Sequence, residues 1–319
     1  MTVVVLPGDG IGPEVMREAL RVLEKVAPDL ELEEHPFGAQ AIRDTGDSLP
    51  EDTLAACKAA EAVLKGPIGD PEFDAAEVRP EQGMLRLRAE LDVYANLRPS
   101  EQGEVDILIV RELVGGLYFG ARGVRDDGTV YDTMEYRPDQ VERIARRAFE
   151  LARARRRKVV SVDKANVLET SRMWRRVVGE VGAGYADIEL EHMLVDNAAM
   201  QLVLATGQFD VLVTENMFGD ILSDLAASLT GGIGLAPSAS LSDSGPGLFE
   251  PVHGSAPDIA GEGVANPMAM MLSTALMLEH GLGRGDDAER LRAAVWAVHE
   301  TGGEPGTAQF GDAVLRALS

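Results

Sequence analysis

The sequence predicts an α/β protein, and three patterns support that prediction. Residues 2 to 6 form an apolar run typical of a buried strand, and a glycine-rich turn follows it before an amphipathic helix. Residues 209 to 214 predict another strand, which leads through a Gly-Asp turn into a helix. Short apolar runs alternate with helical segments between these two points. Such alternation is typical of open α/β sheets, which bind ligands at the carboxyl ends of their strands.

The composition excludes several classes of partner. A formal net charge of −23 over 319 residues argues against nucleic acid and against an anionic membrane surface. No apolar run approaches the ~20 residues of a membrane span, and the N-terminus lacks the basic start of a signal peptide. The single cysteine, Cys57, has no partner for an internal disulfide and fits a reducing compartment. We therefore expect a cytoplasmic protein without a membrane partner.

The N-terminal segment predicts a strand, a turn and a helix in succession. Pro13 suits the first position of the helix, and Glu14 suits its positive end. The turn does not match the dinucleotide fingerprint of a Rossmann fold, because its glycines stand at positions 8, 10 and 12. We further expect a helix over about 51 to 61, a strand at 62 to 64, and a helix running into a strand over 83 to 98.

The middle of the chain predicts two more strands, an arm and a helix. The strands are expected at 106 to 110 and at 159 to 162. Residues 117 to 137 carry aromatics and glycines without a helical period, which predicts a β-hairpin or arm. A helix over 139 to 157 ends in a basic run, which we expect to be solvated and favoured by the helix dipole. The run consists of Arg153, Arg155, Arg156 and Arg157.

The C-terminal third begins with a change of composition. Glycine, proline, serine and alanine dominate residues 230 to 258, which predicts a long structured loop region. Residues 267 to 319 predict two or three helices.

Two acidic residues stand where the strand at 209 to 214 meets its helix. Asp220 and Asp224 are four residues apart, so they share one helical face and repel each other unless a cation or a donor lies between them. Oxygen ligands of this kind suit Mg²⁺ or Mn²⁺. The alternative is one acid that favours the helix dipole and one that is solvated.

Basic residues in so acidic a chain are candidates for binding an anion. Arg88, Arg98 and Arg111 lie at strand or helix ends, and three guanidinium groups together would hold a di- or tricarboxylate. Lysine occurs at only five positions, and Lys164 follows the strand at 159 to 162. A lysine there accepts a proton if desolvation lowers its pKa. The alternative role of each residue is that of a surface or salt-bridged cation.

Three other residues are candidates for chemistry. Tyr118 is either a hydroxyl acid or a packed aromatic residue, and Asp196 is a candidate third metal carboxylate. His253 either faces a cofactor or is a structural loop histidine. The residues alone leave these alternatives open.

Six segments together resemble the β-decarboxylating dehydrogenases, the family of the isocitrate, homoisocitrate, tartrate/D-malate and 3-isopropylmalate dehydrogenases. The motifs stand in the family's order and extend over nearly the whole chain. One departure is the short stretch between Arg98 and Val105, where family members commonly carry a longer loop. The six segments are residues 6–14, 96–99, 110–112, 163–166, 216–224 and 250–267.

The resemblance implies a two-lobed isopropylmalate/isocitrate dehydrogenase-like fold, which is not a Rossmann fold. A central mixed sheet would be flanked by helices, with the active site in the cleft between the lobes. Residues 1 to 93 plus 231 to 319 would form the cofactor-binding lobe. Residues 94 to 230 would form the dimerisation, metal and substrate lobe, with the arm near 117 to 137.

The resemblance also assigns a role to each candidate residue by matched position. Lys164 would help to remove the substrate hydroxyl proton, and Tyr118 would protonate the enolate. Lys164 and Asp196 would come from the second subunit of a homodimer. The substrate carboxylates would bind Arg88, Arg98 and Arg111. Mg²⁺ or Mn²⁺ would bind Asp196, Asp220 and Asp224, and Asp196 would also contact the substrate. The pocket for the substrate's side group would comprise Glu81, Met84, Leu85 and Val167. NAD would bind Ile11, Glu250, His253, Gly254, Ser255, Ala256, Pro257, Asp258, Ile259 and Asn266.

The implied activity is NAD-dependent oxidative decarboxylation of 3-isopropylmalate to 4-methyl-2-oxopentanoate in leucine biosynthesis. The alternatives are a related 2-hydroxy acid, namely homoisocitrate or D-malate/tartrate, and a catalytically silent regulatory homologue. The mostly apolar side-group residues favour an isopropyl group, because an extra carboxylate would stay unpaired there. Asp258 favours NAD⁺ over NADP⁺, because a carboxylate accepts hydrogen bonds from both ribose hydroxyls.

Overall fold

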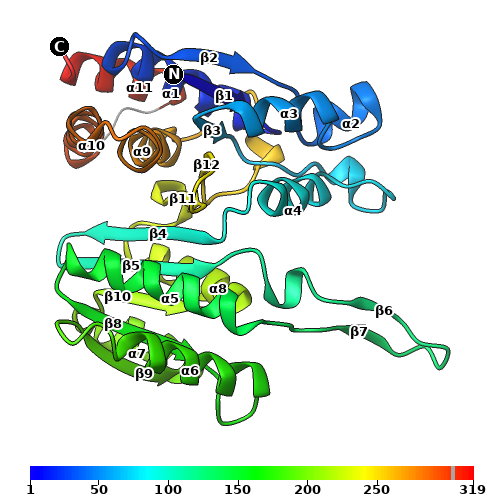
Figure 1. The fold of residues 1–319 in the computed structure, drawn as a ribbon. Helices are drawn as coiled ribbons and strands as arrows, with labels where there is room; N and C mark the ends of the chain where they lie inside the picture. Colours follow the sequence, from blue (N-terminus) through cyan, green and yellow to red (C-terminus); the bar gives the residue numbers. More distant parts are fainter. Residues whose placement is uncertain (303–305) are drawn as a thin grey trace. The chain divides into compact units, whose positions relative to one another are not determined.

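The chain folds into an α/β architecture that divides into two compact units. The computed structural model describes residues 1–302 and 306–319; residues 303–305, inside the predicted segment 231–319, lie outside this description. Unit 1 comprises Met1–Val93 and Ile233–Ser319, and unit 2 comprises Tyr94–Gly232. Strands of a mixed sheet flanked by helices build both units, which confirms the predicted fold class (Figure 1).

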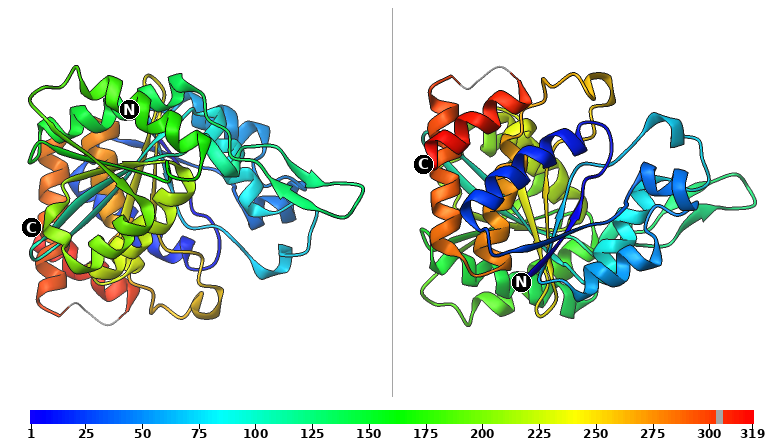
Figure 2. Two further views of the ribbon diagram at one scale, coloured as in Figure 1. Left: turned by 90° about the horizontal axis from the view of Figure 1, so that it is seen from below. Right: turned by 90° about the horizontal axis from the view of Figure 1, so that it is seen from above.

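Unit 1 carries helices on both faces of its strands. The strands are β1 (Thr2–Leu6), β2 (Glu31–Glu34), β3 (Ala62–Lys65), β11 (Pro237–Leu241) and β12 (Gly247–Pro251). The helices are α1 (Gly12–Val26), α2 (Ala39–Thr45), α3 (Glu51–Ala59), α4 (Pro80–Glu90), α9 (Met268–Leu276), α10 (Gly285–Glu300) and α11 (Thr307–Ala317). The strand order is β2-β1-β3-β12-β11, parallel except for the pair β11–β12. Helices α1, α9, α10 and α11 cover one face, and α2, α3 and α4 lie on the other (Figure 2).

Unit 2 repeats this layered arrangement with strands of its own. The strands are β4 (Ala95–Gln102), β5 (Val105–Glu112), β8 (Lys158–Asp163), β9 (Glu189–Leu194) and β10 (Val211–Thr214). The helices are α5 (Pro138–Arg153), α6 (Glu169–Gly182), α7 (Val195–Leu204) and α8 (Asn216–Leu229). The strand order is β4-β5-β10-β8-β9, parallel except for the pair β4–β5. A buried core that includes Ile109, Leu212 and Leu222 joins the strands to α7 and α8.

Two hairpins in unit 2 bear on the sequence predictions. Gln102 pairs with Val105, and Gly103 takes a positive φ of 61°, so the short stretch after Arg98 closes as a tight β-hairpin. The arm predicted within 117 to 137 is confirmed as a hairpin of β6 (Arg122–Val124) and β7 (Val130–Asp132).

The prediction of a loop region over residues 230 to 258 is wrong in part, because two strands lie there. Strands β11 and β12 pair antiparallel there, with Ser240 opposite Leu248. Residues 238 to 240 of β11 are small, and Ala239 and Ser240 are fully buried. Small side chains let a strand pack closely against a helix such as α9, so a composition typical of a loop is compatible with a buried strand.

The basic run after α5 is exposed at Arg153, Arg156 and Arg157, as predicted, but the end of the helix and Arg155 differ from the prediction. The helix ends at Arg153, and Arg157 with a φ of 60° turns the chain toward β8. Arg155 is not solvated, because its Nε donates to Asp210 Oδ1 at 2.9 Å and its guanidinium also binds Asp106. This ion pair fixes the start of β8 and lies outside the helix.

No helix within the described ranges combines the length and apolar character that a bilayer crossing needs. The thiol of Cys57 is buried and free, and burial raises its pKa to about 12. A thiol so protonated is a poor nucleophile, so its contribution is packing.

Candidate functional site

The beginning of α8 brings predicted residues of unit 2 together. Asp220 and Asp224 lie on one face of α8, as their spacing predicts. The helix starts earlier than the glycine turn suggested, because the Glu215 carboxylate accepts hydrogen bonds from the Phe218 and Met217 amides at 2.7 and 3.1 Å. Glu215 is therefore a capping residue that the sequence analysis missed.

Each of the two aspartates has an arginine partner. Arg111 Nη1 donates to Asp220 Oδ1, and Arg98 Nη1 lies 3.2 Å from Asp224 Oδ1. The arginines thus take the place of the cation or donor that two neighbouring carboxylates require. Burial raises the pKa of Asp224, and Arg98 opposes this rise. The Asp220 and Asp224 side chains remain 38% and 53% exposed, so their oxygens are accessible to a ligand.

Tyr118 completes this group from a short 3₁₀ turn, Gly116–Tyr118. Its hydroxyl donates to Asp220 Oδ2 at 3.1 Å, and its ring centre lies 5.8 Å from the guanidinium carbon of Arg111. Burial and the neighbouring Asp220 carboxylate raise the pKa of Tyr118. The phenol therefore holds its proton at neutral pH, as a proton donor must.

Lys164 and Asp196 form a separate pair in unit 2. Lys164 Nζ donates to Asp196 Oδ1 at 2.6 Å, and this hydrogen bond lowers the pKa of Asp196. Val167, also a predicted site residue, is exposed in the turn that follows Lys164. Within the described residues no group of three His, Cys, Asp or Glu side chains is placed to hold a metal ion. One copy of the chain therefore supplies Asp220 and Asp224 together, but not with Asp196.

In unit 1, helix α4 presents a predicted set of residues along one face. Glu81, Met84, Leu85 and Arg88 follow the spacing i, i+3, i+4 and i+7. Met84 is buried, Leu85 is half-buried and Glu81 is exposed. Arg88 Nη2 donates to Glu250 Oε1 at 3.0 Å, which links α4 to the end of β12.

Glu250 lies between two cations. Lys65 Nζ is 2.8 Å from Glu250 Oε2, and both side chains are buried. Although burial alone raises the pKa of Glu250, the Lys65 ammonium and the Arg88 guanidinium bring it down to about 2. The sequence analysis gave Lys65 no role, yet it is one of only five lysines and stands at the end of a buried strand.

The other predicted cofactor residues follow β12 in one loop. Ile11 N donates to Ser255 O at 2.8 Å, so the glycine-rich turn before α1 holds this loop. Ala256 has a positive φ of 40°, and the turn Pro257–Ile259 leaves Asp258 exposed. Gly254 is also exposed in this loop.

Two more predicted cofactor residues have distinct environments. His253 is buried, which lowers its pKa, and its Nδ1 lies 2.9 Å from Gly254 O. Its Nε2 is buried without a hydrogen-bond partner among the described residues. Asn266 Oδ1 accepts from Met268 N at 2.9 Å and so caps α9. The unpaired His253 nitrogen is the atom of this loop that most needs a ligand.

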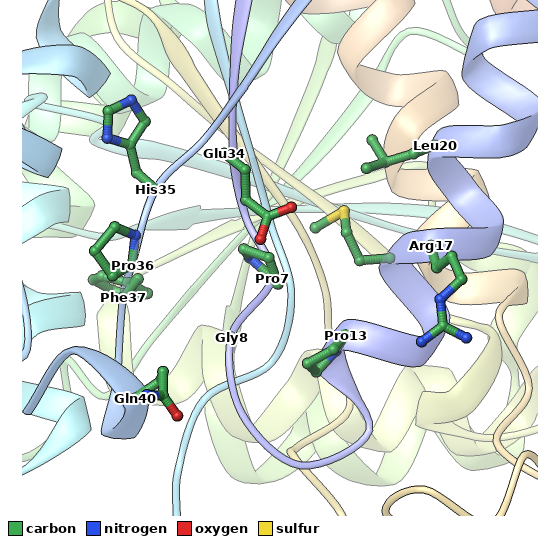
Figure 3. Close-up of a pocket in the computed structure, with 11 residues that line it drawn as sticks. Pro7, Gly8, Pro13, Arg17, Leu20, Glu34, His35, Pro36, Phe37 and Gln40 are labelled. Carbon is green, nitrogen blue, oxygen red and sulfur yellow. The ribbon is translucent and has the colours of Figure 1, made fainter. Parts of the chain in front are cut away.

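A pocket of about 560 Å³ lies elsewhere in unit 1, between α1 and the segment after β2 (Figure 3). Met16, Leu20 and Phe37 form apolar parts of its wall, and Arg17 and Glu34 are charged residues at it. None of the predicted site residues lines this pocket. It is therefore distinct from the residues that the sequence assigned to chemistry.

Comparisons with known proteins agree with this arrangement. Residues 2–313 match the family described as isocitrate/isopropylmalate dehydrogenase. The 3-isopropylmalate dehydrogenase of Zymomonas mobilis is 51% identical, with 100% of each chain aligned. The enzyme of that name from Bacillus licheniformis is 51% identical over 94% of this chain and 88% of its own.

Solved structures of similar proteins have the same fold. An isocitrate dehydrogenase from Methylococcus capsulatus matches with a TM-score of 0.93 and 38% identity, covering 99% of both chains. A β-decarboxylating dehydrogenase from Thermococcus kodakarensis in its apo form matches with a TM-score of 0.85 and 40% identity, over 99% of this chain and 96% of its own.

Proposed function

The chain belongs to the isocitrate/isopropylmalate dehydrogenase family, and from that premise we propose that it catalyses NAD-dependent oxidative decarboxylation of 3-isopropylmalate to 4-methyl-2-oxopentanoate. The observation that carries the proposal is the group of Arg98, Arg111, Tyr118, Asp220 and Asp224. It combines cations for a dicarboxylate, a proton donor and two accessible carboxylates. We assign the reaction to leucine biosynthesis in the cytoplasm.

The arginines bind the substrate in this proposal. Arg98 and Arg111 hold the carboxylates of the malate skeleton, and Arg88 stays a predicted substrate residue by its matched position. Arg98 and Arg111 are buried, and Asn96 Oδ1 accepts from Arg98 Nε at 3.0 Å. A guanidinium held in this way loses little further entropy when it binds a carboxylate.

Asp220 and Asp224 fit a hard divalent cation such as Mg²⁺ or Mn²⁺. They offer half-exposed carboxylate oxygens, which are the ligand atoms that such ions prefer. Asp196 of a second copy would be the third ligand. A cation held by these residues would supply Lewis-acid polarisation of the substrate.

Two side chains move protons in this proposal. Lys164 of a second copy would help to remove the hydroxyl proton of the substrate, and bound NAD⁺ would supply the hydride acceptor. Tyr118 gives its proton to the carbon that has lost CO₂. Its raised pKa suits that donation, because the phenol is protonated before the step.

The cofactor site is proposed along Ile11 and the loop from Glu250 to Asn266. Asp258 would accept hydrogen bonds from the ribose hydroxyls of NAD⁺. No arginine or lysine occurs between Leu241 and Gly283, so this loop offers no cation to the 2′-phosphate of NADP⁺. We therefore assign NAD⁺ as the preferred cofactor.

A homodimer completes the proposed site. Val124 and Val130 pair opposite each other on the arm and are 68% and 73% exposed. A two-stranded ribbon of this kind is marginal alone and needs a covering surface. Helices α7 and α8 pack together and expose further apolar side chains, namely Met200, Val203, Leu204 and Ile221. Mixing Arg111→Ala protein with Lys164→Ala protein should restore part of the activity after subunit exchange, and no recovery would contradict a shared site.

The isocitrate dehydrogenase among the structural relatives makes another 2-hydroxy acid the second candidate. The identity of the side-group residues favours 3-isopropylmalate, because Met84 and Leu85 offer no partner to a third carboxylate. Leu85→Arg should therefore improve activity on homoisocitrate relative to 3-isopropylmalate.

A substrate panel tests the proposal. The purified protein would be assayed with 3-isopropylmalate, isocitrate, homoisocitrate, D-malate and tartrate, each with NAD⁺ and NADP⁺ in the presence of Mn²⁺. The expected result is the highest kcat/KM for 3-isopropylmalate with NAD⁺. A preference for isocitrate would overturn the assignment of the substrate, and no turnover of any acid would favour a silent homologue.

A further inference from the structure

We infer that Asn216 is a positioning residue that orients both Arg111 and the segment carrying Tyr118. The inference rests on the proposed function, because it concerns the carboxylate-binding arginine and the proton donor of that reaction. Asn216 is the first residue of α8 and is fully buried. The sequence analysis included it in a motif and gave it no role.

The amide oxygen of Asn216 fixes the plane of the Arg111 guanidinium. Asn216 Oδ1 accepts from Arg111 Nε at 3.0 Å and from Nη2 at 2.7 Å. Two bonds from one edge of the guanidinium to one oxygen hold the plane, and the opposite nitrogen, Nη1, points to Asp220. The aliphatic part of Arg111 lies against α8, since a Cβ on Gly219 would come within 2.6 Å of it.

The amide nitrogen of Asn216 holds the chain that leads to Tyr118. Asn216 Nδ2 donates to Leu113 O at 3.0 Å and to Gly115 O at 2.9 Å. The turn Gly116–Tyr118 follows at once, and Gly116 needs its positive φ of 75°. Two carbonyl anchors just before such a turn limit where the Tyr118 ring can lie.

The chemistry of the neighbours requires an amide at position 216. Arginine only donates and carbonyl oxygens only accept, so the side chain must accept on one side and donate twice on the other. Of the side chains of this size, aspartate would accept from Arg111 but oppose both carbonyls, and leucine would offer Arg111 no acceptor and the two carbonyls no donor. The backbone nitrogen of Asn216 is also bonded, at 3.0 Å from the Tyr136 hydroxyl oxygen.

Two substitutions distinguish the role of the Asn216 amide oxygen from that of its amide nitrogen. In Asn216→Ala, Arg111 loses its acceptor and the Tyr118 segment loses its donors, so KM for 3-isopropylmalate should rise and kcat should fall, each by about tenfold or more. In Asn216→Asp, the acceptor remains, so KM should recover to within about threefold of wild type while kcat stays low. KM for NAD⁺ should stay within about twofold of wild type in both variants.

Thr214→Val is the matched control. Thr214 is buried two residues earlier and stands opposite Arg111 in the β10–β5 register, so its backbone pairing is unchanged in the variant. Its hydroxyl donates to Val162 O of β8, at 2.9 Å, on the other neighbouring strand. Its kinetic constants should equal those of wild type even where its melting temperature falls. Tm would be measured for all three variants, so that loss of folded protein is distinguished from a change in KM.

The inference would be overturned if Asn216→Ala and Thr214→Val gave equal KM and kcat at a similar loss of Tm. It would also be overturned if Asn216→Asp failed to lower KM below that of Asn216→Ala. The kinetic constants of wild type on the substrate panel test the proposed function separately. If wild type prefers another acid of the panel, the proposed substrate fails, and the same three variants are then compared on that acid.

Discussion

The two units both place carboxylates beside cations, but with opposite accessibility. In unit 1, Glu250 is buried and has two partners, Lys65 and Arg88. In unit 2, Asp220 and Asp224 share Arg98 and Arg111 and keep a large exposed fraction. Both oxygens of the buried Glu250 carboxylate are paired with cations, so this carboxylate holds Lys65 and Arg88 in place. The side chains of Asp220 and Asp224 also have arginine partners but remain 38% and 53% exposed, so a metal ion can reach their oxygens.

Because Asp220 is accessible to a metal ion and Glu250 is buried, substitution of Asp220 should reduce activity more than substitution around Glu250. Asp220→Asn keeps the shape and removes the charge, so kcat/KM with Mn²⁺ should fall at least ~10³-fold, or about 4 kcal/mol. Asp224→Asn should have an effect of similar size. Removal of divalent cations with EDTA should abolish wild-type activity, and added Mn²⁺ should restore it.

The control for Asp220→Asn is a paired aspartate of the same unit at the surface. Asp187 binds Arg153 through two hydrogen bonds of 3.0 Å, and Asp187→Asn should leave kcat/KM unchanged. Near-normal activity of Asp220→Asn, or wild-type activity that survives EDTA, would remove Asp220 from the proposed metal site.

Loss of a cation partner of Glu250 should instead lower the free energy of unfolding. Lys65→Met removes one of its two cations and leaves the buried carboxylate undercompensated, which should lower the free energy of unfolding by about 3 kcal/mol in urea titrations. Lys58→Met removes an exposed partner of Glu90 and should change it by no more than about 0.5 kcal/mol. Equal losses in the two variants would show that the buried ion group does not stabilise unit 1.

Glu112 of unit 2 is also a buried carboxyl, and its pKa is shifted in the opposite direction to that of Glu250. Burial raises its pKa to about 7 from 4.5, although the Val114 and Gly115 amides donate to it. The folded state therefore binds more protons than the unfolded state between these two values, and its contribution to stability falls as pH rises through that window. Glu250, with its pKa lowered to about 2 from 4.5, has the opposite sign, and its contribution is lost as pH falls below 4.5.

Glu112→Gln tests this contrast. The variant lacks the titration, so its unfolding free energy should decrease less than that of wild type between about pH 5 and 7, by on the order of 2 kcal/mol. Urea titrations at several pH values measure the difference. Parallel curves for variant and wild type would show that Glu112 keeps an ordinary pKa.

The smallest expected effect concerns an exposed carboxylate of unit 1, Asp258. Asp258→Lys combined with Ile259→Tyr should reduce or reverse the preference for NAD⁺ over NADP⁺. Wild type should prefer NAD⁺ at least tenfold in kcat/KM, or about 1.4 kcal/mol. A wild-type enzyme that used both cofactors equally would show that this loop does not discriminate between them.

Local sequence patterns predicted much of this arrangement. The i, i+4 spacing placed Asp220 and Asp224 on one face, because helical geometry is local. The alternation of apolar runs predicted β1, β8 and β10 for the same reason. The strand β11 was missed, because alanine and serine carry no strand preference and the burial of that strand depends on distant helices.

Local sequence patterns could not predict contacts between segments that are distant in the chain. Asn96 stands opposite Arg111 in the β4–β5 register, and Arg111 reaches Asn216 on α8 across more than a hundred residues. The partners of Arg155 after α5 likewise lie on other segments, at Asp106 and Asp210. Arginine and asparagine have many alternative partners, so their contacts follow from the packed sheet and not from spacing along the chain.

The most direct measurement of the central claim is the stoichiometry of the reaction with 3-isopropylmalate. Purified protein with NAD⁺ and Mn²⁺ would be followed for NADH formed and CO₂ released, and the organic product would be identified by mass spectrometry. The account predicts equal amounts of NADH and CO₂, with 4-methyl-2-oxopentanoate as the product and no reaction after EDTA treatment. NADH without CO₂, or no NADH from this substrate, would contradict it.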